Sequence, residues 1–336
     1  MRNPMLDEDR PDTVRLSETA ARLVASRALR ACGYTETDAT VVTDQLVDNA
    51  LCGYGFAGLA RILSIAEEAR NRQPRTEPRI VRETASSALV DGGNTIGYIA
   101  AFRGAEIAAR KAKETGLAMV GVYNSYYSGR NAWYVESIVK HGLVAIHTCS
   151  ASPHVLPPGS RAPLLGTNPI SIGFPSLSGP VVWDIGTASV MWGDVMLMAR
   201  LDHELPDGVG FDADGNPARK ATDVAKGGVA PWGGYKGYGL SFAIQALGLL
   251  AGAALGRGVV NDYGFLFIAI DPGLTQPDGA FTGQMSELID TIKSLPKQEG
   301  VDEIRIPSER AFRERARRRV EGIVVEKKIV DALEAL

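Results

Sequence analysis

The sequence predicts an α/β fold in which a mixed sheet in the middle of the chain is flanked by helices from both ends. One indication is that apolar residues recur at helical spacing near both termini, in residues 14–31 and 308–320. Another is that short apolar runs, Gly-rich turns and helical segments alternate irregularly from residue 80 onward, with the most strand-like run at 263–270. With 336 residues, the chain can bury the core of one large domain or of two interlocked ones.

The part before residue 80 is predicted to be helical. Helices are expected over residues 14–31, from 35 to about 50, and over 58–70. Gly33 ends the first of these, and Thr35 is expected to cap the second. The polar, proline-containing stretch 71–78 then leads to a different kind of structure.

The rest of the chain is predicted as strands, turns and helices in succession. Strands are expected at 88–91, 117–122, 143–148, 263–270 and 303–306, and helices at 98–114, 135–140, 240–255, 285–293, 308–320 and 326–336. Residues 205–217 are predicted to form a surface hairpin, and 232–239 a glycine-dense loop before a buried helix. Ser308 is expected to cap the helix that follows it. The predicted domains are a helical one, 1–78 plus 285–336, and a sheet domain, 79–284.

Composition and charge exclude several classes of protein. With 45% hydrophobic and 22% charged residues, the chain has the composition of an ordinary globular protein, and a net charge of −3 predicts neither a nucleic-acid nor a membrane partner. No stretch reaches the roughly 18 apolar residues of a membrane span, and the N-terminus lacks a signal peptide's apolar core. Three widely spaced cysteines are interpreted as reduced and structural, which predicts a cytoplasmic protein. The arginine-rich segment 313–319 is interpreted as a solvated helix face or a subunit contact.

The stretch 163–189 holds the strongest candidate for a site. A tight polar turn, GTNP at 166–169, precedes an alternating apolar run, and a second apolar run delivers Asp184 into the small-residue turn 185–189. Such turns can place backbone N–H groups and hydroxyls around an anionic ligand. A carboxylate at the end of an apolar strand is costly to bury unless it has a partner or a task. The alternative is an ordinary turn that Asp184 caps.

Five motifs occur in one order along nearly the whole chain: GTNP at 166–169, WDIGTAS at 183–189, DADGNP at 212–217, PWGGYKGYGL at 231–240 and IPSER at 306–310. Together they resemble the malate/L-lactate dehydrogenase family of NAD(P)H enzymes, which also includes sulfolactate and ureidoglycolate dehydrogenases and cyclic ketimine reductases. The resemblance implies a non-Rossmann cofactor-binding sheet domain, a helical dimerisation domain formed from both termini, NADP or NAD as cofactor, and a homodimer.

A literal GxGxxG at 53–58 is rejected as a Rossmann fingerprint, because a helix rather than a strand precedes it. In the resembled family this segment reads roughly G-x-D-S-H-G-x-x-R. Here Phe56 stands where the serine is expected and Ala57 where the histidine is expected, whereas Arg61 keeps the position that grips the substrate carboxylate. The family's acid/base pair is therefore expected to be missing.

The family's N-S-x-H-x-G loop reads NSYYSG at 124–129. Asn124 and Ser125 keep the pattern that the resemblance places against the cofactor, and Tyr127 replaces the histidine. Tyr127 is a candidate proton donor, although a tyrosine pKa near 10 matches neutral pH poorly. His154, in a loop near the expected substrate pocket, is a second candidate. Packing of a pocket wall by the tyrosine, and a structural or surface role for the histidine, are the alternatives.

The other candidate site residues also follow from the resemblance. It implies a catalytic role for Asp184 and a substrate contact for Thr167. It implies cofactor contacts for Ile185, Gly186, Lys236, Gly237, Pro307 and Arg310. The ammonium of Lys236, flanked by glycines, suits a phosphate or a carboxylate. No metal-ligand spacing is found in the sequence.

The missing histidine bears on the reaction. Reduction of a ketone creates an alkoxide, so a general acid contributes about 10²–10⁴-fold to the rate. A protonated imine already carries its proton, so the absence of a general acid lowers the rate of its reduction less. The predicted function is therefore hydride transfer from NAD(P)H to C2 of a small 2-imino (cyclic ketimine) or 2-oxo carboxylate, in a specialised biosynthetic enzyme. The alternative is a repurposed family member without redox chemistry, which catalyses elimination or cyclisation or only binds.

Overall fold

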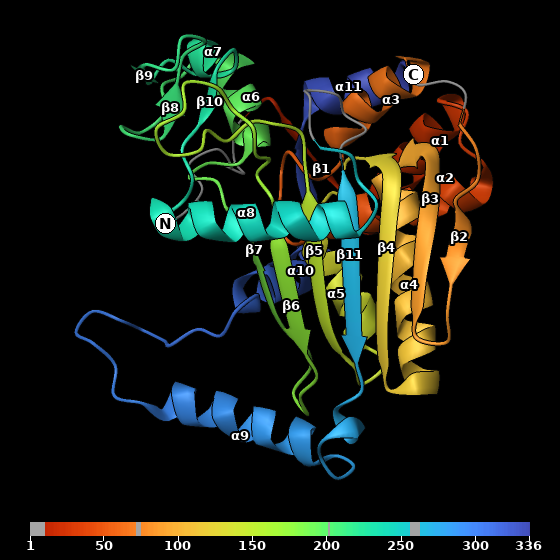
Figure 1. Ribbon diagram of the computed structural model, residues 1–336. Coiled ribbons are helices and arrows are strands. Elements are labelled where there is room, and N and C mark those ends of the chain that lie inside the picture. Colours follow the sequence, from red (N-terminus) through yellow and green to blue (C-terminus); the bar gives the residue numbers. More distant parts are fainter. Residues whose placement is uncertain (1–10, 72–74, 201, 256–262) are drawn as a thin grey trace. The chain divides into compact units, whose positions relative to one another are not determined.

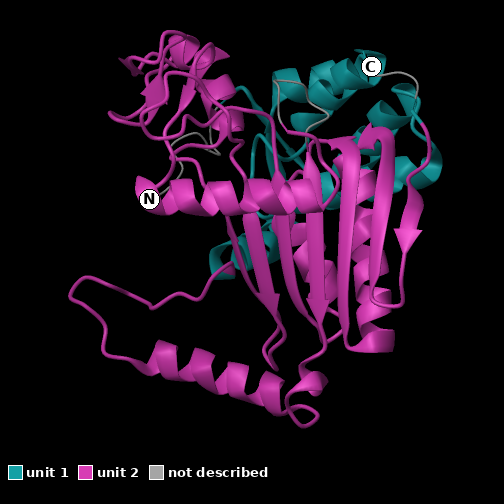
Figure 2. Ribbon diagram, in the orientation of Figure 1, with its two compact units in different colours: residues 1–75, 309–336 teal, residues 76–308 magenta. Residues whose placement is uncertain are grey.

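The computed structural model describes residues 11–71, 75–200, 202–255 and 263–336. The chain divides into two compact units: residues 1–75 with 309–336 form unit 1, and residues 76–308 form unit 2 (Figure 2). Residues 285–308, which the sequence assigned to the helical domain, belong to unit 2 in this division. No helix among the described residues has the length and apolar character needed to cross a membrane.

Unit 1 is built from both ends of the chain (Figure 1). Its elements are β1 (Thr13–Leu16), α1 (Glu18–Ala31), α2 (Glu36–Leu51), α3 (Arg61–Asn71), α10 (Glu309–Glu321), β12 (Ile323–Glu326) and α11 (Lys327–Glu334). The predicted helix over 14–31 is wrong at its start, because Thr13–Leu16 pairs antiparallel with Ile323–Glu326. Pairing with a distant segment overrides the local helical spacing. The predicted cap of α2 is confirmed, since the Asp38 amide donates to Thr35 Oγ1 at 3.1 Å.

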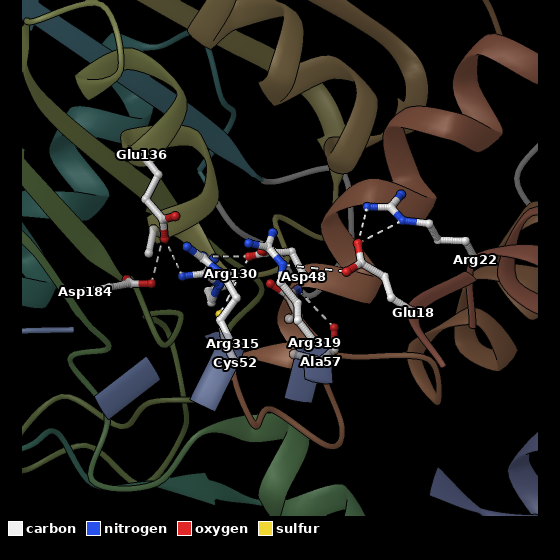
Figure 3. Close-up of polar contacts among 12 residues, drawn as sticks. Glu18, Arg22, Asp48, Cys52, Ala57, Arg130, Glu136, Asp184, Arg315 and Arg319 are labelled. Carbon is white, nitrogen blue, oxygen red and sulfur yellow. Dashed lines mark hydrogen bonds and ion pairs between the residues drawn. The ribbon is translucent and has the colours of Figure 1, made fainter. Parts of the chain in front are cut away.

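The arginines of α10 do not all face solvent. Arg315 donates to the Asp48 carboxylate at 2.8 Å (Figure 3). Arg318 donates to the Ala50 carbonyl at 2.9 Å. Arg318 is only 5% exposed and also bonds Glu314 at 3.1 Å. The interpretation of 313–319 as a solvated face or subunit contact is therefore wrong for these two arginines, which tie α10 to α2 within unit 1.

A seven-stranded mixed sheet forms the centre of unit 2 and confirms the predicted fold class. Its order is β2 (Arg79–Glu83), β3 (Ser87–Ile96), β4 (Leu117–Tyr126), β11 (Gly264–Ile270), β5 (Val144–Ser150), β6 (Ile170–Phe174) and β7 (Val181–Ile185). Only β3 and β4 pair in parallel, and the other neighbours are antiparallel. Helices α4 (Gly97–Thr115) and α5 (Asn131–Val139) cover one face, and α8 (Tyr235–Leu250) crosses the other (Figure 1).

Aromatic side chains fill the layer between the sheet and α5. His147 stacks on Phe267 with ring centroids 4.1 Å apart, and Tyr134 meets both rings edge-on. Burial lowers the pKa of His147 to about 3, so its imidazole is neutral. His147 is a fully buried residue of β5.

A smaller lobe of unit 2 follows β7. It contains α6 (Trp192–Arg200), α7 (Ala221–Val224) and a three-stranded sheet of β8 (Gly210–Phe211), β9 (Pro217–Ala218) and β10 (Gly228–Val229). The predicted hairpin at 205–217 is confirmed in part, because β8 pairs antiparallel with β9. The core of this smaller lobe is apolar and includes Val155, Leu165, Val195 and Leu205.

The later part of unit 2 corrects three expectations. Residues 303–306 form no strand. Helix α8 begins at Tyr235 and so takes in half of the predicted glycine loop, and it is not fully buried, since Phe242 is 62% exposed. Ser308 was expected to cap α10 with its side chain. It has a positive φ of 64°, and its hydroxyl instead donates a hydrogen bond to the carbonyl of Val182 in the edge strand β7, at 2.6 Å. The 3₁₀ turn η2 (Pro272–Leu274) and α9 (Ala280–Ser294) complete the unit.

Candidate functional site

Asp184 lies near the end of the edge strand β7, opposite Ser171 of β6. Its Oδ2 accepts the backbone N–H of Ala132, 2.9 Å away in the first turn of α5 (Figure 3). The carboxyl is only partly exposed, and burial raises its pKa to about 6 despite that hydrogen bond. Asp184 can therefore exist in both protonation states near neutral pH.

A buried ion pair lies beside this carboxyl. Arg130, at the N-cap of α5, donates to Glu136 Oε1 at 2.9 Å, and their side chains are 4% and 6% exposed (Figure 3). The Arg130 charge lowers the pKa of Asp184, and the Glu136 charge raises it. The sequence does not predict this pair, because the expected helix begins at residue 135 and leaves Arg130 in a loop. The only signal was an Arg and a Glu six residues apart in an otherwise apolar stretch.

Several polar groups near Asp184 have no hydrogen-bond partner among the described residues. They are both amide atoms of Asn131, the Ser171 hydroxyl and Nε2 of His147. Asn131 is 2% exposed and directly precedes Ala132, and Ser171 lies between Asp184 and His147 across neighbouring strands. A buried polar group without a partner is costly, so these groups mark a place where a water or a polar ligand group would be stabilised.

The segment 124–129, which is the end of β4 and the turn after it, is held by its own side chains. Asn124 adopts a left-handed φ of 53° and donates to Asp91 Oδ1 at 2.7 Å. The Ser125 hydroxyl donates to the Thr95 carbonyl at 2.7 Å and is fully buried. Tyr127 also has a positive φ, 58°, and its ring meets that of Tyr126 edge-on at 5.4 Å. Two strained non-glycine residues in one short segment are a feature of ligand-binding sites.

The GTNP turn and the turn after β7 are bonded to each other. The Thr167 carbonyl accepts both the amide and the hydroxyl of Thr187, at 2.9 and 3.0 Å. Asn168 is completely buried and bonds Ala151, Ser241 and Gln245. The structure therefore brings together Thr167, Ile185 and Gly186, which the sequence placed in one site.

Helix α8 begins with an uncapped, glycine-rich turn. Gly233 and Gly234 adopt φ angles of 58° and 62°, and no side chain caps the helix. Lys236 is exposed in the first turn, and a Cβ on Gly237 would lie 2.0 Å from the Trp232 carbonyl oxygen, so glycine is required there. Backbone N–H groups at a helix N-terminus, with an ammonium beside them, fit the phosphates of a dinucleotide.

His154 packs against an aromatic ring. It stacks on Trp192 with centroids 3.8 Å apart, and burial lowers its pKa to about 4. A neutral imidazole at pH 7 is a poor proton donor, so the geometry favours the structural alternative.

The remaining candidates lie outside the sheet. In unit 1, Arg61 opens α3 with its guanidinium 5.3 Å from the centre of the Phe56 ring, and Asn49 donates to the Ala57 carbonyl at 3.0 Å, which fixes that loop. Arg310 lies in the first turn of α10, and Pro307 precedes Ser308 at the end of unit 2. Among the described residues, no cluster of three His, Cys, Asp or Glu side chains is suited to hold a metal ion.

Comparison with known proteins gives the class of this molecule. Residues 16–334 match the model of the malate/L-lactate dehydrogenase family, and the chain belongs to that family. It is 32% identical over 331 residues to L-sulfolactate dehydrogenase of Methanothermobacter thermautotrophicus, covering 95% of each chain. It is 31% identical over 274 residues to a Delta(1)-pyrroline-2-carboxylate/Delta(1)-piperideine-2-carboxylate reductase of Pseudomonas putida, covering 77% of each.

A solved structure agrees with these matches. The delta1-piperideine-2-carboxylate reductase of Pseudomonas syringae pvar. tomato superposes with a TM-score of 0.85 at 27% identity, and the match covers 96% of this chain and 99% of that one. The chain is thus an NAD(P)-dependent oxidoreductase with the mixed-sheet fold of this family.

Proposed function

We propose that this enzyme transfers hydride from NADPH or NADH to C2 of a small 2-imino carboxylate, such as a cyclic ketimine, or of a 2-oxo carboxylate. The observation that carries the proposal is Asp184, a carboxyl with a pKa of about 6 beside the unpartnered amide of Asn131. A protonatable group next to spare donors and acceptors is suited to a reacting C=N or C=O group. The enzyme is proposed to act as a cytoplasmic homodimer.

The cofactor would be held at several of the places described above. The α8 N-terminus, Lys236 and Gly237 have the chemistry of a phosphate site. Contacts with the rest of the dinucleotide are proposed for the Asn124–Ser125 segment, Ile185, Gly186, Pro307 and Arg310. Since the Asn124 and Ser125 side chains bond Asp91 and Thr95, that segment would present its backbone. When bound, the reduced nicotinamide supplies the hydride.

The protein's own residues would bind the substrate and move its proton. Arg61 is proposed to pair with the substrate carboxylate and Thr167 to contact the substrate. Tyr127, held in a strained conformation, would line the pocket. His154 is proposed to stabilise the smaller lobe through its stack on Trp192.

An imine carboxylate is the preferred substrate class for a chemical reason. In the two motifs that resemble the family's histidine positions, the chain has Ala57 and Tyr127. Without an imidazole as general acid, the rate of ketone reduction falls more than the rate of iminium reduction. The ketone oxygen must gain a proton during the reaction, whereas the iminium nitrogen already carries one. The reductases of the two Pseudomonas species described above, whose names refer to cyclic imine carboxylates, support this preference.

The second candidate is a member of this family that has lost redox chemistry and performs elimination or cyclisation, or binding alone. The same two positions, Ala57 and Tyr127, favour it, because they remove the residues that the family pattern uses for proton transfer.

Cofactor binding and turnover separate the two candidates. The chain has four tryptophans, so titration with NADPH and with NADH is expected to quench their fluorescence. Oxidation of NADPH by Δ1-piperideine-2-carboxylate, with slower oxidation by pyruvate, is the expected result for the imine reductase. If neither nucleotide binds, the hydride proposal is wrong.

Arg61→Ala is expected to raise the KM for the carboxylate substrate and leave the Kd for NADPH unchanged. Loss of a buried charged hydrogen bond costs about 2–3 kcal/mol, or roughly 30- to 140-fold in KM. Arg70→Ala, on the exposed end of the same helix, is the matched control and is expected to behave as the wild type. Equal KM values for the two variants would exclude Arg61 from the substrate site.

A further inference from the structure

Helix α8 buries a mostly polar side and exposes an apolar one. It packs on β5 and β11, across the face of the sheet opposite α4 and α5 (Figure 1). The Ser241 carbonyl and the Gln245 side chain accept hydrogen bonds from the buried Asn168, at 2.9 and 3.1 Å. A surface helix normally turns its polar residues to solvent and its apolar residues to the core, so the polarity of α8 is reversed. Its buried residues are Gly237, Ser241, Ile244, Gln245 and Gly248.

The exposed side of α8 is one continuous apolar stripe. Tyr235 is 77% exposed, Phe242 62% and Leu250 60%, and no other described helix has more than one exposed large apolar side chain. Residues 237–256 contain no charged residue. At 3.6 residues per turn the exposed apolar positions fall within a sector about 120° wide. We call them the α8 stripe: Tyr235, Gly239, Phe242, Ala243, Ala246, Leu249 and Leu250.

The size of the α8 stripe indicates a protein partner. It exposes on the order of 600 Å², at the upper end of the largest apolar patches of typical monomers, about 300–600 Å². Two copies that cover each other's stripe bury on the order of 1,200 Å², which reaches the range of specific interfaces, about 1,200–2,000 Å². A lipid surface fits less well, because membrane-binding helices carry several Lys or Arg residues beside their apolar face, and Lys236 is the one charged residue of α8.

A second copy of the chain fits the α8 stripe because the stripe complements itself. Its large and small side chains are arranged so that an antiparallel pair of α8 helices, centred between residues 242 and 243, places one kind opposite the other. Phe242 then lies opposite Ala243 of the partner subunit. Gly239 lies opposite the partner's Ala246. A two-fold axis makes each of these contacts twice, and alternation of large and small side chains lets two helices interdigitate closely.

We propose that the α8 stripe is the dimer interface of this protein, formed by antiparallel packing of α8 against α8 of a second copy. This inference rests on the proposed function, which includes a homodimer. It assigns the interface to unit 2, whereas the family resemblance implies dimerisation through the helices of both termini. It also accounts for the reversed polarity of α8, because the apolar side is then buried in the dimer.

The antiparallel arrangement has a consequence for the proposed cofactor site. Tyr235 lies opposite Leu250 of the partner subunit, next to Lys236 in the first turn of α8. Each copy thus borders the proposed phosphate site of the other. The two sites lie at opposite ends of the paired helices, roughly 24 Å apart for helices of this length.

Sedimentation velocity over a dilution series of cofactor-free protein tests the interface. The wild type is expected to be a dimer. Phe242→Glu/Ala246→Glu places carboxylates of both copies against each other and is expected to raise the dissociation constant about 100-fold or more. Both positions are exposed within one chain, so the variant is expected to keep the wild-type circular dichroism spectrum. A variant that stays as dimeric as the wild type would overturn the proposal.

Leu23→Glu is the matched control. Leu23 is the exposed large apolar residue of α1, at 71%, and lies in the terminal helices of unit 1. This variant is expected to dissociate at the same concentration as the wild type. A wild type that is monomeric would also overturn the proposal, and binding of that monomer to vesicles of phosphatidylcholine and phosphatidylglycerol would assign the α8 stripe to a lipid surface instead.

Crosslinking gives a second readout that does not depend on a destabilised dimer. Cys52 and Cys149 are buried, so Cys32→Ser leaves a background without an exposed thiol among the described cysteines. In that background, Ala243→Cys lies close to the two-fold axis and is expected to give a covalent dimer with a short bis-maleimide, whereas Leu23→Cys is expected to give none. Absence of the crosslink through residue 243 would overturn the proposal.

Neither measurement needs turnover, so the interface and the proposed reaction can fail separately. NADPH oxidation by Δ1-piperideine-2-carboxylate, measured on the same wild-type protein, decides the reaction. A dimer that dissociates in Phe242→Glu/Ala246→Glu supports the interface even if the wild type does not oxidise NADPH. An active wild type whose dimer survives that double substitution rejects the interface alone.

Discussion

Replacing Asp184 with asparagine is expected to lower kcat for reduction of a 2-oxo acid by about 10²–10⁴-fold, the usual contribution of a positioned general acid. The carboxamide keeps the shape and can still accept the Ala132 N–H, which Asp184 binds at 2.9 Å. It has no proton to give at neutral pH. Steady-state rates with saturating NADPH measure the effect, and the loss should be smaller for a cyclic imine carboxylate, whose nitrogen already carries the proton.

Two measurements accompany this variant. Asp290→Asn, at an exposed position of α9, is the control and is expected to leave kcat unchanged. Because folding raises the pKa of Asp184 from 3.8 to about 6, ionising it costs folding free energy. The wild type should therefore lose stability relative to Asp184→Asn as the pH rises through that interval. A full rate in the asparagine variant would remove Asp184 from the chemistry.

Asn168→Ala is expected to destabilise the protein by about 3–5 kcal/mol, because three hydrogen-bond partners would lose a buried amide at once. Asn168 is completely buried; its Oδ1 accepts from Ala151 N and its Nδ2 donates to Ser241 O and Gln245 Oε1. These bonds join the GTNP turn to β5 and α8. Urea unfolding followed by tryptophan fluorescence measures the change as a lower midpoint with an unchanged slope.

The control is Asn216→Ala in the exposed turn between β8 and β9. Within the described part of the chain its side chain bonds only Asp212, at 3.4 Å, so a loss of stability below about 1 kcal/mol is expected. If Asn168→Ala unfolds at the same urea concentration as this control, the turn is not held by its amide.

The sequence predicts the fold where local chemistry and tertiary structure agree. Thr35 caps α2 as expected, and the strand at 263–270 is a central strand of the sheet. The prediction fails where pairing with a distant segment determines the structure. Residues 14–16 were predicted to be helical, but residues 13–16 form a strand that pairs with residues 323–326. Residues 235–239 were predicted as part of a glycine-dense loop, but they form the first turns of α8, and no local signal in the sequence marks that start.

The candidate site is predicted in the same uneven way. Motif order brings the GTNP and WDIGTAS turns together, and the bond between Thr167 and Thr187 joins them in the structure. Arg130 and Glu136 carry no motif, and their significance depends on burial and on the fold of α5, which single-sequence patterns do not supply. The neutral state of His154 depends in the same way on the ring of Trp192.

The place of β11 in the sheet has a consequence for biogenesis. β11 pairs with β4 on one side and β5 on the other, although both of those strands precede it by more than a hundred residues. Before β11 has been synthesised, β2, β3 and β4 cannot be joined to β5, β6 and β7. The edges of β4 and β5 are then open, and open strand edges are sites of mispairing. Synthesis must pass residue 270 before the halves can join, so folding of unit 2 is expected to be slow and largely post-translational.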